Sequence, residues 1–280
     1  MNRLAACIVF SLIGPCSALA QGKCEPEKVA QKYPTLAGKT IKVATSPTYA
    51  PYAYTDPKDG NRLIGSDIEI SEAALDCVGL KYEYLKGAFS SLLATTTSGQ
   101  TDVMVANLYF TPERNKVADF AIYMKGGGAL LVRKGNPHKI KTMDDLCGLT
   151  TNAVVASFSH PILQRQQEKC RADGKKELNI VLATETDAAL RGLESGRADF
   201  VLDNVGAAAV RVAAEPERYE VAFTSVQDVL VGNAVKKGND AMLQAYYDGM
   251  KAIQDSGVMA KIFDKYNLDR SLIAPVEMKK

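Results

Sequence analysis

Two similar segments in this chain limit the folds that it can adopt. Residues 98–107 (SGQTDVMVAN) and 195–204 (SGRADFVLDN) match at a constant offset of 97. Apolar residues at helical spacing precede each segment, and the glycine at its second position favours the left-handed conformation that ends a helix. The apolar runs after Asp102 and Asp199 are typical of buried strands in a parallel sheet. The chain therefore contains two related units of alternating helices and strands.

Two such units predict an α/β protein with two lobes. A length of 280 residues fits two domains at about 150 residues each. Ligands gather at the carboxyl ends of strands in open α/β sheets, so Ala106-Asn107 and Asp203-Asn204 are expected to face each other across a cleft. We expect each lobe to have its own mixed sheet flanked by helices, which would keep Asp102 and Asp199 out of one continuous sheet.

The boundaries of these lobes follow from glycine and strand patterns. The glycine run 126–128 is expected as a flexible step into a first crossing strand, and a second extended run begins at Val229. A helical pattern from Asp240 to Tyr266 is interrupted at Gly257. The expected organisation is a signal peptide (1–20), a first lobe (21–128 and 236–280), a second lobe (133–225) and two hinge strands (129–132 and 226–235).

The N-terminus has the pattern of a secretory signal peptide. One positive charge, Arg3, precedes an apolar run from Leu4 to Ile13, and the segment ends in Ser17-Ala18-Leu19-Ala20. This pattern predicts cleavage before Gln21 and export to the periplasm. The apolar run is shorter than the about 20 residues that span a bilayer, so no stable membrane insertion is expected.

Four cysteines remain in the expected mature chain, namely Cys24, Cys77, Cys147 and Cys170. An even number in an oxidising compartment favours disulfides over metal ligands. Counting leaves three pairings open; joining the most local cysteines in each half would give Cys24–Cys77 and Cys147–Cys170. No Cys-x-x-Cys motif supports a redox role.

Charge and histidine content exclude other classes of function. Thirty-four basic residues balance 32 acidic ones without a basic cluster, so nucleic acid is not an expected partner. His138 and His160 have no Cys or His at ligand spacing, so we expect no metal. The 126–128 glycines lack the following Lys-Ser/Thr of a phosphate-binding loop, and no cofactor is predicted.

One segment has the features of an anion site. Thr111 offers a capping hydroxyl, Pro112 suits the first helical position, and Arg114 falls in the first turn. A guanidinium with free backbone N–H groups can bind a carboxylate. The alternative is a solvated arginine on a helix flank.

Over residues 36–270, the sequence resembles the bacterial extracellular solute-binding proteins of family 3, which deliver polar amino acids to ABC transporters. The matching stretches are 41–44 (IKVA) with 49–52 (YAPY), 65–70 (GSDIEI), 111–114 (TPER), 119–121 (DFA) with Tyr123, 145–148 (DLCG), 196–199 (GRAD) with Asp203, and 262–266 (IFDKY). Each stretch is weak alone, but their order and spacing are specific. The resemblance implies the type II periplasmic binding fold, two lobes joined by two crossing strands.

The resemblance also assigns roles to individual residues. It implies that Arg114 binds a ligand α-carboxylate, with help from residues near Asn107 and Tyr109. Ser157 and Phe158, in the turn after a strand of the second lobe, would contact the same carboxylate. It further implies that Asp203 binds the α-ammonium group, although Asp203 could instead cap a helix.

The side-chain end of the pocket departs from the family pattern. The family often holds the ligand side chain between two aromatic residues, at Tyr49 and at the position of Ser66, so one aromatic wall is absent. Ser46 stands where members that bind cationic amino acids often carry an acid. Tyr109 and Phe158 replace small residues and add bulk near the carboxylate, so an unusual carboxylate ligand is also possible.

The expected function is that of a monomeric, non-enzymatic binding protein that captures a small amino acid or related carboxylate and works with ABC transporter permease subunits. Two alternatives stay open. One is a periplasmic enzyme of the cyclohexadienyl dehydratase type, for which Glu69, Glu185, His160 or Tyr109 would have to donate a proton inside the cleft. The other is a ligand-sensing accessory protein.

Overall fold

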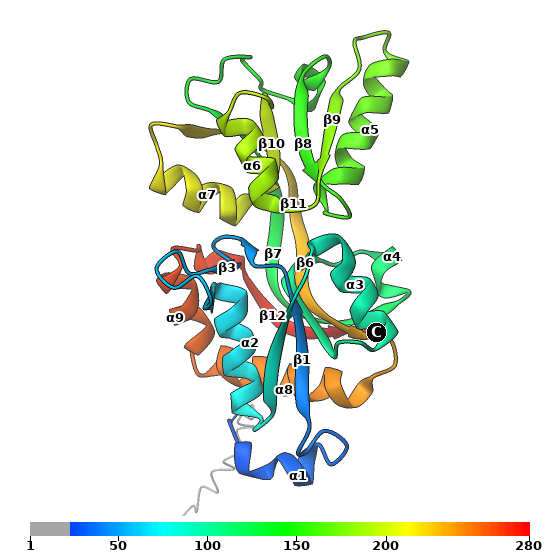
Figure 1. Cartoon of the computed structure of the whole chain (residues 1–280), viewed down its shortest axis with the longest axis vertical. Coiled ribbons are helices and arrows are strands. Elements are labelled where there is room, and N and C mark those ends of the chain that lie inside the picture. Colours follow the sequence, from blue (N-terminus) through cyan, green and yellow to red (C-terminus); the bar gives the residue numbers. More distant parts are fainter. Residues whose placement is uncertain (1–22) are drawn as a thin grey trace, which may run out of the picture.

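The predicted two-lobed α/β architecture is present in the computed structural model, which describes residues 23–280 and only the backbone of 225–228 (Figure 1). The predicted signal peptide and its cleavage site before Gln21 lie outside the described residues. Two α/β halves lie one above the other and are joined by two long strands, β7 (Ala118–Arg133) and β11 (Tyr219–Lys236). We call the half that contains β1 the first lobe and the half that contains β8 the second lobe.

The first lobe combines a parallel core of strands with helices from both ends of the chain. Its strands are β1 (Thr40–Thr45), β5 (Lys81–Lys86), β6 (Val103–Tyr109) and β12 (Ile273–Lys279), with a small separate sheet of β2 (Thr48–Tyr49), β3 (Ala53–Thr55) and β4 (Leu63–Ile64). Its helices are η1 (Pro26–Lys28), α1 (Val29–Lys32), α2 (Ser66–Cys77), α3 (Phe89–Ser98), α4 (Pro112–Asn115), α8 (Asp240–Asp255), α9 (Val258–Lys265) and η3 (Arg270–Leu272).

The second lobe is smaller and repeats the same alternation. Its strands are β8 (Thr150–Val154), β9 (Asn179–Ala183) and β10 (Phe200–Asn204). Its helices are η2 (Met143–Leu146), α5 (Ser159–Ala172), α6 (Thr186–Glu194) and α7 (Val205–Ala214).

The two lobes share one sheet, so the expectation of two separate sheets was wrong. The strand order is β5-β1-β6-β11-β7-β10-β8-β9, with β12 also paired to β7. The strands β7 and β11 contain 16 and 18 residues and pair from one end to the other. At about 3.3 Å per residue, each is long enough to cross both lobes, and it therefore carries the hydrogen-bond ladder through the hinge.

The glycine run 126–128 lies inside β7 and not in a step before it. Its first glycine faces the ring of Tyr109, and a Cβ atom built on Gly126 would lie 2.8 Å from Tyr109 Oη. The Tyr109 hydroxyl donates to the carbonyl oxygen of Gly127 at 3.0 Å. Gly126 therefore makes room for a large side chain that lines the cavity between the lobes.

The sequence repeat corresponds to a structural repeat. Asp102 accepts a hydrogen bond from the Lys42 amide at 2.8 Å, and Asp199 accepts one from the Thr150 amide at the same distance. In each lobe the repeated aspartate thus ties the segment before its own strand to the neighbouring strand, β1 or β8. The glycines that precede these aspartates have positive φ angles of 84° and 75°, as predicted for helix ends.

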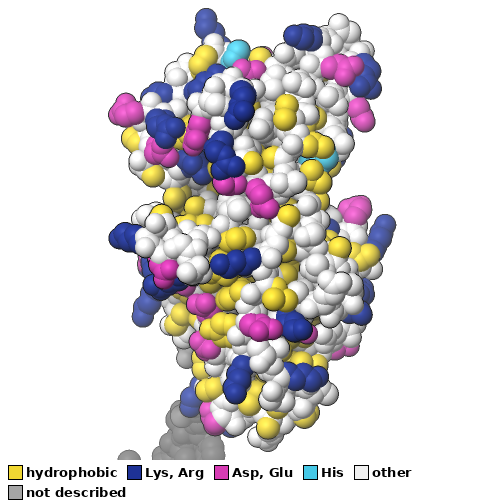
Figure 2. Space-filling model, viewed as in Figure 1, with side chains coloured by type: hydrophobic (Ala, Val, Ile, Leu, Met, Phe, Trp, Pro, Cys, Tyr) yellow, Lys and Arg dark blue, Asp and Glu magenta, His cyan; other side chains and the backbone are white. Residues whose placement is uncertain are grey.

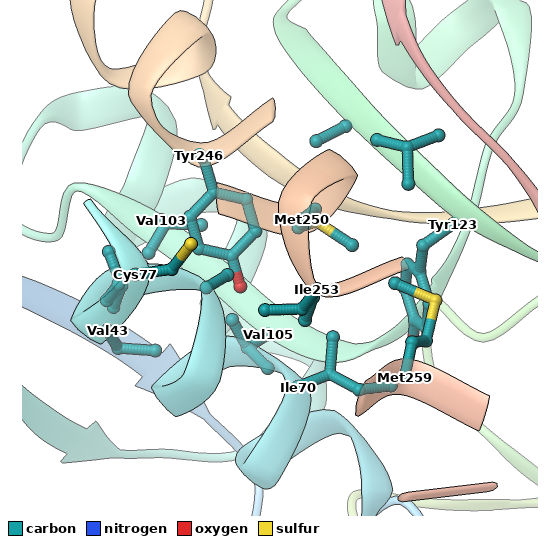
Figure 3. Packing of buried hydrophobic residues seen from close by; sticks show 14 of the residues in the cluster. Val43, Ile70, Cys77, Val103, Val105, Tyr123, Tyr246, Met250, Ile253 and Met259 are labelled. Carbon is teal, nitrogen blue, oxygen red and sulfur yellow. The ribbon is translucent and has the colours of Figure 1, made fainter. Parts of the chain in front are cut away.

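The largest hydrophobic core lies in the first lobe. Figure 3 shows Tyr246, Met250 and Ile253 of α8 beside Ile70 and Cys77 of α2. These side chains are buried and belong to one cluster with Val43, Val103 and Val105 of the sheet. The cluster holds α2 and α8 on the sheet, and α2 begins directly below the space between the lobes.

Both disulfides of the expected local pairing are present. Cys24 bonds to Cys77 at the end of α2, and Cys147 bonds to Cys170 in α5. Each bridge stays within one lobe and leaves the junction between the lobes free.

The surface shows mixed charges. On the face drawn in Figure 2, Lys and Arg side chains are interspersed with Asp and Glu over both lobes, and the outline narrows where the lobes meet. In the part of the chain that the structure describes, no helix combines the length and hydropathy needed to cross a bilayer.

Candidate functional site

A cavity lies between the two lobes, at the carboxyl ends of β6, β8 and β10. Seven of the eight predicted ligand-binding residues line it, all except Ser66. The complete lining is Tyr49, Phe89, Ala106, Asn107, Tyr109 and Arg114 from the first lobe, and Asn152, Val154, Ser157, Phe158, Ser159, Thr186, Ala189, Val201, Leu202 and Asp203 from the second.

Arg114 supplies the only positive charge among the residues that line the cavity. Thr111 caps the single helical turn of α4 as predicted, because its hydroxyl oxygen accepts from the Arg114 amide at 3.1 Å. The guanidinium donates to the carbonyl oxygens of Tyr109 and, across the cleft, of Ala156. Burial lowers the pKa of Arg114 to about 10, so the group is still charged near neutral pH. Within the described residues it has no carboxylate partner.

Asp203 supplies the only negative charge among those residues. Its carboxylate is buried, and Oδ1 accepts from the Tyr49 hydroxyl at 2.5 Å and from the Asn204 amide at 2.8 Å. Oδ2 is buried with no hydrogen-bond partner within the described residues. Burial raises the pKa of Asp203. A buried carboxylate oxygen without a partner is costly, so this atom is suited to accept from a ligand cation.

Asn204 joins the two lobes beneath the cavity. Its Nδ2 donates to Asn107 Oδ1 at 3.2 Å and to Tyr109 Oη at 2.6 Å, and its Oδ1 accepts from the Tyr52 hydroxyl at 2.6 Å. The two asparagines that end the repeated segments therefore face each other, as predicted from their constant offset. Asn204 Oδ1 also caps α7, and this leaves Asp203 free of the capping role.

A second set of contacts closes the cleft beside the cavity. Glu185 precedes α6 in the second lobe, and its Oε2 accepts from the hydroxyls of Ser46 at 3.0 Å and Thr48 at 2.9 Å in the first lobe. These bonds engage a carboxylate that is adjacent in sequence to the cavity residue Thr186. Ser46 thus holds the lobes together instead of facing a cationic ligand.

Two aromatic rings that line the cavity stack across the cleft. Tyr109 of the first lobe stacks on Phe158 of the second, with ring centroids 4.2 Å apart and planes inclined by 13°. Ser157, next to Phe158, shares a hydrogen bond of 3.0 Å with Ser159. The two bulky side chains, Tyr109 and Phe158, therefore form a stack that spans the cleft.

The buried carboxylate of Asp67 accepts a hydrogen bond from the backbone amide of the cavity residue Asn107. Asn107 has a φ of 48°, in the left-handed region that few residues other than glycine adopt. Asp67 is 1% exposed; one oxygen accepts from the Asn107 amide at 2.6 Å and the other from the Tyr123 hydroxyl at 2.6 Å. Burial raises the pKa of Asp67 from its ordinary 3.8 to about 6, although both hydrogen bonds oppose this shift. Asp67 thus fixes the backbone of a cavity residue.

We expect the buried charge of Asp67 to make folding stability depend on pH. Because the pKa of Asp67 is higher in the folded state than in the unfolded state, folding favours the protonated carboxyl. The stability that this protonation contributes is fully present below pH 4 and is lost as pH rises through about 6. At 1.36 kcal/mol per pKa unit, the loss is about 3 kcal/mol. Urea unfolding between pH 4 and 7 should show this decrease in the wild type and a much flatter profile in Asp67→Asn. The exposed Glu83→Gln is the control, and equal slopes for wild type and Asp67→Asn would contradict the assignment.

Ser66 does not reach the cavity. It is the first residue of α2 and is 1% exposed, and its amide donates to the Pro51 carbonyl at 2.9 Å. Nine of the sixteen cavity residues were absent from the predicted ligand-binding set, among them Phe89, Asn152 and Thr186. Phe89 begins α3, and its spacing in the sequence is that of a core residue of a helix. Thr186 follows the end of β9 by three residues, and this position at the carboxyl edge of the sheet could have indicated that Thr186 lines the cavity.

Of the four proton donors considered for an enzyme, only Tyr109 lines the cavity. Burial raises the pKa of Tyr109 above its usual range, and its hydroxyl already donates to Gly127. Glu69 is engaged instead with Lys265 and Tyr266 on the other side of α2. Within the described residues, no group of three or more His, Cys, Asp or Glu side chains could hold a metal ion.

The sequence matches a family model over residues 41–269, and the model describes the bacterial extracellular solute-binding proteins, family 3. The chain belongs to this family. Its curated relatives include a probable histidine-binding protein of Neisseria gonorrhoeae, 26% identical, with 90% of this chain and 92% of the relative covered. Another is the L-cystine-binding protein TcyJ of Escherichia coli K12, 24% identical, with 81% and 82% covered.

Solved structures of amino-acid-binding proteins have the same fold. An ancestral arginine-binding protein bound to arginine superimposes with a TM-score of 0.72 at 28% identity and covers 81% of this chain and 97% of its own. An ancestral amino-acid-binding protein described as a precursor of cyclohexadienyl dehydratase has a TM-score of 0.72 at 23% identity, covering 86% and 98%, and shows the fold alone. The predicted family and type II binding fold are thus confirmed.

Proposed function

We propose that this family member is a periplasmic binding protein that captures a small amino acid or related carboxylate and delivers it to an ABC transporter. The observation that carries the proposal is one cationic and one anionic side chain in the same interlobe cavity, neither of them paired with an opposite charge among the described residues. A zwitterion supplies both missing partners. Curated relatives named as amino-acid-binding proteins support the same function.

In this proposal the ligand lies between the lobes with its two charged ends held from opposite sides. Arg114 and the hydroxyl of Ser157 bind the carboxylate, and Asp203 Oδ2 accepts from the ammonium group. The cation comes from the first lobe and the anion from the second, so a bound zwitterion favours lobe closure. We propose that the lobes, 21–128 with 236–280 and 133–225, move about the hinge strands 129–132 and 226–235.

Native mass spectrometry of the protein, exported and purified without denaturation, tests this function. We expect a noncovalent mass excess equal to a small amino acid or related carboxylate, which disappears after denaturation and returns when that compound is added back. Calorimetry should then give saturable 1:1 binding, with the compound recovered unchanged. The absence of binding by any amino acid or small carboxylate would contradict the proposal, and conversion of the compound would favour an enzyme.

A further inference from the structure

We infer that Asn204 is a positioning residue of the ligand site, which links ligand binding to closure of the lobes without contacting the ligand. This inference rests on the proposed function and deepens it, since it assigns the closure step to a particular side chain. Asn204 belongs to the second lobe, is fully buried and does not line the cavity. Three observations carry the inference: the fixed orientation of its amide, the partners of that amide in the first lobe, and the place of those partners in the cavity wall.

The start of α7 fixes the orientation of the Asn204 amide. Asn204 Oδ1 accepts from the backbone amides of Gly206 at 2.7 Å and Ala207 at 3.4 Å. Backbone N–H groups can only donate, so the oxygen of the side chain must face the helix. The Tyr52 hydroxyl of the first lobe donates to the same oxygen at 2.6 Å. The nitrogen end of the amide is therefore fixed as a donor that faces away from α7.

This donor reaches two residues of the first lobe that line the cavity. Asn204 Nδ2 donates to Tyr109 Oη at 2.6 Å and to Asn107 Oδ1 at 3.2 Å, and both acceptor residues are buried. Tyr109 and Asn107 stand two positions apart at the end of β6. One amide of the second lobe thus holds the end of the first-lobe strand that forms a wall of the cavity.

Opening of the cleft breaks these interlobe contacts together. In the proposed hinge motion Asn204 moves with the second lobe, whereas its partners Tyr52, Asn107 and Tyr109 move with the first. The capping bonds of Asn204 lie within the second lobe and persist when the lobes separate. Closure restores the interlobe hydrogen bonds, so their free energy adds to that of the ligand contacts in the closed form.

A shorter capping residue separates the two roles of Asn204. Serine caps a helix about as well as asparagine, but its side chain has no amide and is too short to reach β6. Asn204→Ser should bind the tightest-binding amino acid of the wild type about tenfold to 100-fold more weakly, as expected for the loss of two ordinary hydrogen bonds. Because these bonds hold the closed form, stopped-flow measurements should show most of the loss as faster ligand dissociation.

A second variant covers the case in which Asn204→Ser does not fold. Asn204→Asp has nearly the same shape and is an equally good helix cap, but it has no group that can donate to Asn107 or Tyr109. This variant should also bind the amino acid at least about tenfold more weakly than the wild type.

A double-mutant cycle tests whether Asn204 acts through the first lobe. Tyr109→Phe removes the hydroxyl that accepts from Asn204 and leaves the ring that stacks on Phe158. In the Tyr109→Phe background, Asn204→Ser should therefore cost at least about threefold less affinity than in the wild type. A purely structural role at the start of α7 would give equal costs in both backgrounds, and that result would overturn the inference.

Asn239→Ser is the matched control. It makes the same substitution at the cap of α8, where Asn239 accepts from the Met242 amide at 3.3 Å and does not line the cavity. This variant should keep the wild-type affinity and dissociation rate. A loss of affinity equal to that of Asn204→Ser would show a general effect of cap replacement and would contradict the inference.

The remaining outcomes separate this inference from the proposed function. Wild-type affinity in both Asn204→Ser and Asn204→Asp would overturn the inference and leave the proposed function intact, because the wild type would still bind its amino acid. Failure of the wild type to bind any amino acid or small carboxylate would overturn the proposed function itself, and the inference with it.

Discussion

Replacing Arg114 or Asp203 with alanine is expected to weaken ligand binding by about 30-fold to several thousand-fold. Asp203 is buried and Arg114 is half-buried between the lobes, so removal of either one leaves a ligand charge without its partner. Truncation of one member of a buried charge pair costs roughly 2–5 kcal/mol, and each 1.4 kcal/mol is a tenfold change in affinity. Calorimetry with the tightest-binding amino acid measures the effect directly.

Two matched controls separate the loss of a ligand contact from a loss of stability. Arg133 also donates to two backbone carbonyls, those of Leu193 and Ala198, but does not line the cavity. Asp119 is likewise a buried carboxylate of the sheet, and its partner is Lys237. Arg133→Ala and Asp119→Asn should keep wild-type affinity if they fold. Unchanged affinity in both Arg114→Ala and Asp203→Ala would show that the ligand does not bind between them.

The second large effect is expected from removal of the disulfides. The Cys24–Cys77 bridge closes a loop with a sequence separation of 53, and Cys147–Cys170 closes one of 23. In the chain-entropy model, these loops correspond to about 4 and about 3 kcal/mol of stability. Urea unfolding of the Cys24→Ala/Cys77→Ala and Cys147→Ala/Cys170→Ala variants should show losses of this order, with the larger loss for the first pair.

Ligand affinity distinguishes the disulfide variants, which should lose stability, from the Arg114 and Asp203 variants, which should lose binding. Each bridge lies within one lobe and outside the cavity, so a folded disulfide variant should bind the ligand with wild-type affinity. A loss below about 0.5 kcal/mol in both disulfide variants would contradict a stabilising role, since that is the range of ordinary surface substitutions.

The repeated segments allowed the centre of the site to be predicted from sequence. Positions with one constant offset occupy equivalent places in two related lobes, so Asn107 and Asn204 could be expected to face each other before their hydrogen bond was known. The cap at Thr111 was also predictable, because it depends only on residues within one turn of helix. These local patterns predicted an anion site at Arg114, whereas its place in the ligand cleft was implied by the resemblance to the family.

Features that depend on contacts between distant residues could not be predicted. The single sheet depends on pairing of β7 with β11 along their whole length, and glycines in β7 had suggested a break there. Phe89 has the spacing of a core residue, and nothing in the sequence shows that its ring faces the cavity. The bond between Ser46 and Glu185 joins positions 139 residues apart, so the role of Ser46 in closure was visible only in the structure.

The most direct test is the crystal structure of the protein with the amino acid that binds it most tightly. We predict that the ligand carboxylate lies within about 2.7–3.2 Å of the Arg114 guanidinium and that the ammonium group lies at the same range from Asp203 Oδ2. A ligand in the reverse orientation, or one bound outside the cavity between the lobes, would contradict recognition of a zwitterion by these two residues.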